Sequence, residues 1–182
     1  MAPGRGADKL CPMESVRIEH TFECSEQTFW DKIFFDEEYN RKLFLERLKF
    51  PVWKETKREE RGGEIHRVVQ VVPDMGEVPA ALKKLVGDNA GYEERGVFDP
   101  VKHRYRIQIV PNALGDKLSI NGEMYSEAVG SDKMKRIFRA EVVAKIFGVG
   151  MLEKRIMSDL TRSYDVSARF TQTFIAERGL GG

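Results

Sequence analysis

Several features that would point directly to a function are scarce or missing in this sequence. The 182 residues include only two cysteines, Cys11 and Cys24, and these show no CxxC or metal-ligand spacing. A disulfide framework is therefore not expected, and a reducing, cytoplasmic compartment is the default. No apolar run approaches the ~18 residues of a membrane-spanning helix, and the first residues lack the hydrophobic stretch of a signal peptide.

The chain also lacks an excess of charge of either sign. Its 30 Lys and Arg residues are balanced by 29 Asp and Glu residues, which leaves a net charge of +1. A nucleic-acid-binding protein usually concentrates positive charge on one face, so no nucleic-acid partner is expected. The basic pairs Lys83-Lys84 and Lys135-Arg136 are expected on solvated faces, with transient contact to anionic lipid head groups as the alternative.

Recognisable catalytic motifs are missing as well. There is no GxSxG, no HExxH, no P-loop and no glycine-rich dinucleotide motif. The carboxylates fall at alternating positions that are expected to face solvent, and no pair stands out as an acid and a base. His20, His66 and His103 show no metal-site spacing. We therefore expect no metal and no cofactor, and we name no catalytic residue.

The longest regular pattern lies near the C-terminal end, in residues 151–177. Apolar or small residues recur there at steps of three or four, with charged residues between them, which predicts one amphipathic helix. At 1.5 Å per residue the helix would span roughly 40 Å. Its stripe consists of Leu152, Ile156, Leu160, Ser163, Tyr164, Ser167, Phe170 and Phe174.

Most of the chain before this helix has the pattern of strands. Residues 15–24 alternate, with Val16, Ile18, His20 and Phe22 on one face. Two short helices follow: Ser25 is the predicted N-cap of the first, the second starts near residue 36, and Pro51 ends the second. Further strands are predicted at residues 52–61, 64–72, 91–98, 103–110, 117–128 and 134–147, with a short helix at 77–87.

Short turns join most of these strands, so neighbours in sequence are expected to pair antiparallel. Gly62-Gly63 is a two-residue hairpin signal, and Asp99-Pro100 is a turn pair. The fold class is therefore α+β with one domain. We expect a disordered leader over residues 1–14, the domain over 15–178 and a tail over 179–182.

This order of elements, and some of the residues, resemble the START-like superfamily, also called SRPBCC, birch-pollen-allergen-like or helix-grip. The likeness lies in VRIEHTFECSEQTFWDKIFFDEEYNRKLF and in the closing strand and helix. The segments GGEIHRVVQVVP and PAALKKLVG resemble an uncharacterised bacterial branch of the superfamily. The resemblance covers about residues 15–177.

The resemblance implies a curved antiparallel sheet of about seven strands that wraps around the long C-terminal helix. It also implies a cavity between sheet and helix for lipids, sterols, polyketides or other apolar molecules. Some members of the superfamily are enzymes, some are carriers and some are protein-binding cochaperones, and fold alone does not choose among these roles.

Seven residues are candidates for contact with such a ligand. They are His20, Met124, Phe138, Leu160, Ser163, Tyr164 and Ser167. His20 is either a satisfied core histidine or a polar anchor for a ligand head group. Ser163, Tyr164 and Ser167 either allow close packing of the helix on the sheet or leave room and hydrogen bonds for a ligand. Met124 either lines an adaptable pocket or belongs to an ordinary core.

Three functions follow from this interpretation. The first is binding or transport of a hydrophobic small molecule without catalysis. The second is a cyclase or dehydratase acting on a polyketide-like substrate, which requires polar side chains that converge inside the cavity. The third is a protein-interaction module with a filled core and an exposed apolar patch. The oligomeric state stays open.

Overall fold

The protein folds into one seven-stranded antiparallel sheet and a long helix. The computed structural model describes residues 13–74, 76, 87, 90–145 and 150–181. The strand order is β1-β7-β6-β5-β4-β3-β2, so every neighbouring pair except β1–β7 is consecutive in sequence. The strands are β1 (Met13–Phe22), β2 (Val52–Arg61), β3 (Glu64–Val72), β4 (Tyr92–Asp99), β5 (Arg104–Pro111), β6 (Leu118–Ala128) and β7 (Met134–Ala144).

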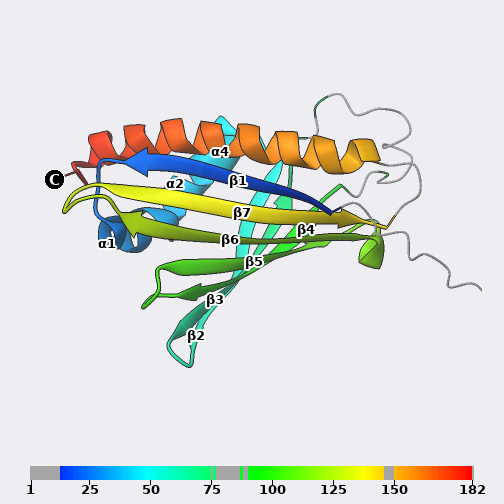
Figure 1. Ribbon diagram of the computed structural model, residues 1–182, viewed down its shortest axis with the longest axis horizontal. Coiled ribbons are helices and arrows are strands. Elements are labelled where there is room, and N and C mark those ends of the chain that lie inside the picture. The colour runs from blue at the N-terminus through cyan, green and yellow to red at the C-terminus, as the bar shows by residue number, and fades with distance from the viewer. Residues whose placement is uncertain (1–12, 75, 77–86, 88–89, 146–149, 182) are drawn as a thin grey trace, which may run out of the picture.

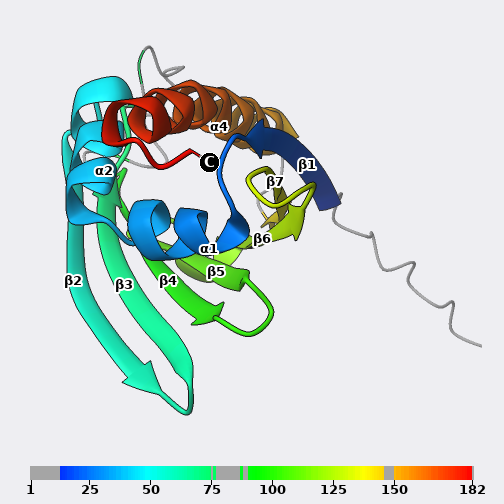
Figure 2. The same ribbon diagram turned by 90° about the vertical axis from the view of Figure 1, so that its left-hand side faces the viewer.

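The long helix α4 (Gly150–Arg178) lies along the sheet beside β1 (Figure 1). Figure 2 shows the sheet curving from β2 to β1 around the space beneath α4. The predicted helix at 151–177 is therefore confirmed to within one residue at each end. The predicted fold, a curved sheet that wraps around the C-terminal helix, is confirmed as well.

Two short helical segments connect β1 to β2. The first consists of α1 (Glu26–Phe29) and the π-helix η1 (Trp30–Phe34). The second consists of α2 (Glu37–Arg41) and the π-helix η2 (Lys42–Arg47). Both predicted starts are confirmed, because Ser25 Oγ accepts from the Thr28 N–H at 3.1 Å and Asp36 Oδ1 accepts from the Tyr39 N–H at 2.7 Å. The π-helical turns were not predicted.

The strand predictions differ from the structure mainly at their ends. The last strand stops at Ala144, where the alternation predicted a strand to residue 147, and a 3-10 turn η3 (Gly115–Lys117) precedes β6. At the hairpin between β2 and β3, Gly62 and Gly63 both have positive φ (61° and 81°), as this tight turn requires. The helix predicted at 77–87 lies outside the described residues except for Gly87, and so do residues 1–12 of the predicted leader. The leader prediction was wrong for Met13 and Glu14, which belong to β1.

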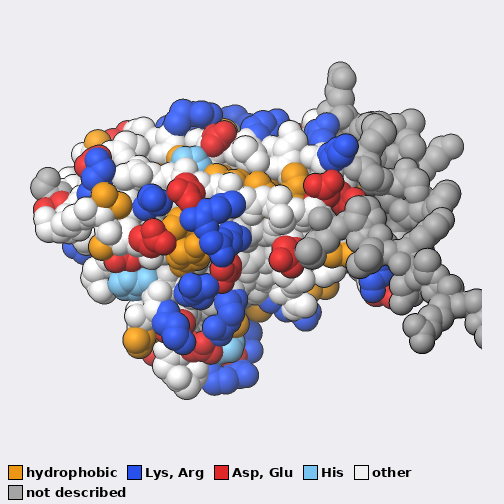
Figure 3. Space-filling model, in the orientation of Figure 1, with side chains coloured by type: hydrophobic (Ala, Val, Ile, Leu, Met, Phe, Trp, Pro, Cys, Tyr) orange, Lys and Arg blue, Asp and Glu red, His pale blue; other side chains and the backbone are white. Residues whose placement is uncertain are grey.

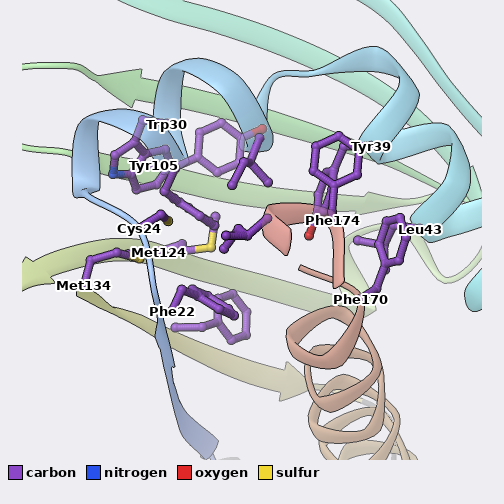
Figure 4. Close-up of a cluster of buried hydrophobic side chains, with 14 of the residues drawn as sticks. Phe22, Cys24, Trp30, Tyr39, Leu43, Tyr105, Met124, Met134, Phe170 and Phe174 are labelled. Atoms are coloured by element: carbon purple, nitrogen blue, oxygen red, sulfur yellow. The ribbon is translucent and has the colours of Figure 1, made fainter. Parts of the chain in front are cut away.

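The hydrophobic core fills one end of the space under α4 (Figure 4). Tyr39 and Leu43 face Phe170 and Phe174 of α4, and the Tyr39 ring stacks on Phe170 with centroids 5.4 Å apart. Trp30 is fully buried, and its indole N–H donates to Ser126 Oγ at 2.9 Å. This end therefore fixes α1 and α2 against the sheet and α4.

The outer face of the sheet is charged but balanced. Basic and acidic side chains lie side by side on the face of Figure 3, which carries β1, β7 and β6. Ion pairs such as Arg17–Glu19 and Arg104–Glu123 join them. Among the helices that the structure describes, none is long and apolar enough to cross a membrane.

Candidate functional site: a cavity between the sheet and α4

A cavity of about 300 Å³ lies between the concave face of the sheet, the helical segment α2–η2 and the first two thirds of α4. Its walls are mostly apolar. They include Leu43, Phe44, Ile107, Ile109, Ile120, Met124, Phe138, Ala140, Ile156 and Leu160. The alternation of the strands and the helical stripe of α4 turn these side chains toward one another.

The first polar group on the cavity wall joins β3, β4 and β5. The Tyr105 hydroxyl donates to Glu94 Oε1 at 2.9 Å, and Arg67 Nη2 donates to the same oxygen at 3.4 Å. Glu55 Oε2 lies 4.0 Å from Arg67 Nε. Burial, reinforced by the neighbouring Glu94 charge, raises the pKa of Tyr105 well above its usual value of 10.

A glycine makes this arrangement possible. The Tyr105 side chain lies across β4 directly over Gly96, where an added Cβ would be 1.7 Å from its hydroxyl oxygen. On the neighbouring strand β3, Arg67 is the residue opposite Gly96 in the register of the sheet. Because Gly96 has no side chain, the Tyr105 ring can lie across β4 and reach Glu94.

The second polar group is centred on Arg136 of β7, which is 3% exposed. Its Nη1 donates to Ser167 Oγ at 3.0 Å, and its Nη2 donates to His20 Nδ1 at 3.1 Å and to the Tyr164 carbonyl at 3.3 Å. The guanidinium lies over the rings of Phe22 and Tyr164, at 5.1 and 5.0 Å from their centroids. Burial lowers the pKa of Arg136, although an arginine keeps its charge in proteins.

The hydrogen bonds continue from Ser167 into the helical segment α2. Thr171 Oγ1 donates its one hydrogen to the Ser167 carbonyl at 2.8 Å. Thr171 Oγ1 must therefore be the acceptor in its bond with the Tyr39 hydroxyl, at 2.6 Å. The Ser167 hydroxyl lies 3.4 Å from the Tyr39 oxygen. This chain of bonds connects β7, α4 and α2 at the boundary between core and cavity.

His20 is held between two charged groups. Its Nδ1 accepts from Arg136, so the proton is assigned to Nε2, which donates to Asp165 Oδ1 at 3.0 Å. Burial and the Arg136 charge lower the pKa of His20, and Asp165 opposes them. His20 is therefore neutral near pH 7, and both ring nitrogens have partners, as a satisfied core histidine requires.

Six of the seven candidate residues lie on the cavity wall. They are Met124, Phe138, Leu160, Ser163, Tyr164 and Ser167. The Phe138 and Tyr164 rings stack across the gap between sheet and helix, with centroids 4.1 Å apart and planes 19° apart. His20 does not line the cavity, but it accepts a hydrogen bond from Arg136, which lies on the cavity wall.

Two expectations about charged residues were wrong. The pair Lys135-Arg136 was expected on a solvated face, but Arg136 is buried because it precedes Phe138 by two and shares its inward face. The carboxylates were expected to face solvent, but Glu94 lies on the cavity wall, and Glu153 is 2% exposed and accepts from the Ala144 N–H at 2.9 Å. Lys83 and Lys84 lie outside the described residues.

Sequence reasoning also missed Arg67 and Tyr105 on the cavity wall. The alternation of inward and outward residues along β3 and β4 indicated that charged side chains face the cavity. Arg67 precedes Val69 and Val71 on the inward face of β3, and Glu94 precedes Gly96 and Phe98 on β4. Among the described residues, no three His, Cys, Asp or Glu side chains are grouped closely enough to hold a metal ion.

Comparison with protein families decides where the chain belongs. A family model described as "Protein of unknown function (DUF2505)" matches residues 17–175. The chain belongs to this family. A search of curated proteins found no match to this DUF2505 protein.

Solved structures with the same fold cover nearly the whole DUF2505 chain. One is an aromatase/cyclase from a Streptomyces species, with 12% sequence identity and a TM-score of 0.66, covering 92% of this chain and 96% of that one. Another is a norcoclaurine synthase point mutant from Thalictrum flavum, with 14% identity and a TM-score of 0.65, covering 92% and 97%. At such low identity these likenesses show the helix-grip fold and leave the function to the site itself.

Proposed function

We propose that this protein binds a hydrophobic small molecule in the cavity between the sheet and α4. The observation that carries the proposal is the cavity itself, about 300 Å³ with mostly apolar walls and a few polar groups. Sites for small molecules have this character, and their volumes begin at about this size. A protein-interaction module with a filled core would not contain a cavity of this size.

The binding energy would come mainly from burial of apolar surface. A buried CH₂ group contributes about 0.8 kcal/mol, so a chain of about ten such groups supplies on the order of 8 kcal/mol, which corresponds to micromolar affinity. The stacked pair Phe138–Tyr164 and the side chains of Ile120 and Leu160 offer this surface from both sides of the cavity.

A substitution that fills the cavity tests this proposal. Ser163 lies on the cavity wall and makes no hydrogen bond to another described residue, so Ser163→Phe places a ring in the space. Titration with the uncharged fluorescent probe N-phenylnaphthylamine is expected to show binding by the wild type and about tenfold or weaker binding by Ser163→Phe. Ser158→Phe is the control, since Ser158 is exposed on the same helix.

Two further measurements complete the test. Native mass spectrometry and solvent extraction of freshly purified protein are expected to release an apolar small molecule. If the wild type binds neither the probe nor a copurified molecule, the proposal is wrong. It is also wrong if Ser163→Phe and Ser158→Phe bind the probe equally well.

A second candidate function is catalysis on a polyketide-like substrate, and the group Arg67–Glu94–Tyr105 favours it. Glu94 is a base within 2.9 Å of a tyrosine hydroxyl and 3.4 Å of a buried guanidinium, all on the wall of one apolar cavity. Glu94 would remove a proton next to a substrate carbonyl and become neutral. The Tyr105 O–H and the Arg67 N–H, which both donate to Glu94 beforehand, would then donate to the enolate oxygen and stabilise it.

The test for catalysis uses a linear poly-β-ketone thioester mimic and detects cyclised or dehydrated product by mass spectrometry. Wild-type protein is expected to form product. Glu94→Gln is expected to lose at least a hundredfold in rate while it still binds N-phenylnaphthylamine. An equal rate for wild type and Glu94→Gln would reject this second function and leave the binding proposal unaffected.

A further inference from the structure

The chemistry of the ligand is indicated by the surroundings of Arg136. This arginine lies on the cavity wall and is 3% exposed. Burying a cation is costly unless an opposite charge accompanies it. The question is therefore what balances the charge of Arg136.

Among the described residues, no carboxylate bonds directly to Arg136, and the attraction of Asp165 acts only at longer range. The three hydrogen-bond acceptors of its guanidinium are Ser167 Oγ, His20 Nδ1 and the Tyr164 carbonyl, all of them uncharged. No described carboxylate lies within 4 Å of its nitrogens. Asp165 is bonded to the far side of His20 instead, and Arg136 Nε–H has no partner at all.

The other buried arginine on the wall shows the contrast. Arg67 is also 3% exposed, and its Nε and Nη1 lack hydrogen-bond partners as well. Arg67 differs in its carboxylates, because it donates to Glu94 through Nη2 and Glu55 Oε2 lies 4.0 Å from its Nε. Its charge is therefore balanced within the protein. The stacking of Arg136 between Phe22 and Tyr164 is weaker compensation than a carboxylate, because a ring offers only its quadrupole.

We infer that the ligand carries a carboxylate that pairs with Arg136, and that its apolar chain lies along the cavity. This inference rests on the proposed binding function. Donors for a carboxylate are at hand, since the Tyr164 and Ser163 hydroxyls line the cavity and bond to no other described residue. A cavity of about 300 Å³ accepts one chain and not a diacyl lipid, so the class is a single-chain carboxylic acid such as a fatty acid.

The experiment compares three ligands of one chain length: dodecanoate, methyl dodecanoate and dodecanol. Each displaces N-phenylnaphthylamine at about pH 8, where a carboxyl group is ionised. The wild type is expected to bind dodecanoate roughly 10- to 100-fold more tightly than the ester or the alcohol, because a charge-assisted hydrogen bond is gained.

Arg136→Met is expected to remove this preference and to keep the affinity for dodecanol. Arg139→Met is the matched control, because Arg139 lies on the same strand but is exposed on the outer face. It is expected to keep the wild-type preference. Arg136→Gln loses the charge but keeps an N–H for Ser167, and it is expected to behave like Arg136→Met. The test can therefore be completed with either variant if the other does not fold.

The outcomes separate the two proposals. If the wild type binds dodecanol and dodecanoate equally, the ligand carboxylate is rejected and the binding function stands. If the wild type binds none of the three ligands and not the probe, both proposals fail. If Arg136→Met or Arg136→Gln weakens all three ligands by the same factor, Arg136 only supports the fold and the inference is wrong.

Discussion

Single residues of the sheet determine which polar groups on the cavity wall can meet. Gly96 is one of them, since Tyr105 occupies the place where any other side chain would begin. The neighbours of Gly96 in the sheet register are Arg67 on β3 and Ile107 on β5. A residue with no side chain is therefore required for the bond between Tyr105 and Glu94.

Gly96→Ala is expected to destabilise the protein by about 1–3 kcal/mol, because the new methyl group overlaps the fully buried Tyr105 ring. Gly130→Ala is the control, since a Cβ there meets no atom within 4 Å. Urea denaturation of both variants checks the prediction. Equal stability of the two variants would contradict it.

His20 makes the stability depend on pH in a defined direction. Its pKa in the folded state is lowered by burial and by Arg136 of β7, with Asp165 of α4 in opposition. The unfolded chain therefore takes up the proton first, near the ordinary value of about 6.5. The contribution of His20 to stability is present above about pH 6.5 and is lost as the pH falls toward its lowered pKa.

We expect His20→Asn to flatten the loss of stability between about pH 7 and pH 5, because asparagine can bond to both neighbours and does not titrate. The measurement is urea unfolding at several pH values in this window. His66→Asn, on β3 away from Arg136, is the control. If the wild type and His20→Asn lose stability with the same slope, His20 is not the titrating group.

At the scale of elements, the short helices matter because they form one wall of the cavity. The segment α2–η2 contributes Tyr39 and Asn40 from α2 and Leu43 and Phe44 from η2. The Asn40 side chain donates to the carbonyls of Phe34 and Asp36, each at 2.8 Å, and so connects the two helical segments. The wall is therefore built from local hydrogen bonds as well as from packing.

Asp36→Ala is expected to cost about 1 kcal/mol of stability, because the Tyr39 N–H loses its N-cap acceptor. Amide hydrogen exchange is expected to accelerate first over residues 37–47. Asp36→Asn keeps an oxygen at the cap and is expected to restore most of the loss. If amide exchange over residues 37–47 is unchanged in Asp36→Ala, the N-cap does not stabilise this wall of the cavity.

At the scale of the whole molecule, the sheet, α4 and the short helices enclose a space that none of them defines alone. The filled core lies at the Phe170–Phe174 end of α4, and the cavity lies under the rest of the helix. A bound ligand would therefore contact both the sheet and α4 and stabilise the contact between them.

Saturation with dodecanol at about 100 times its Kd is expected to stabilise the protein by about 2.7 kcal/mol. For a chain of this length, that corresponds to a rise in Tm of roughly 5–10 °C. The binding is also expected to show a negative heat-capacity change by calorimetry, because apolar surface is buried. Ser163→Phe should show little of either effect, and an unchanged wild-type Tm at saturation would contradict the prediction.

The amino-acid sequence by itself determined the elements and their order. Alternation along the strands, the cap at Ser25, the helix start near Asp36, turns such as Gly62-Gly63 and the stripe of residues 151–177 all report local backbone geometry. That geometry depends on side chains only a few positions apart. The same patterns placed six of the seven candidate residues on faces that do line the cavity.

Only the tertiary structure decided which charges are buried and what they meet. Arg136 and Ser167, His20 and Asp165, and Tyr105 and Glu94 come from separate elements that the curvature of the sheet brings together. A basic residue in an alternating strand faces solvent or interior according to what covers that strand, which no local pattern records. The cavity volume and the unpaired charge of Arg136 follow from that packing.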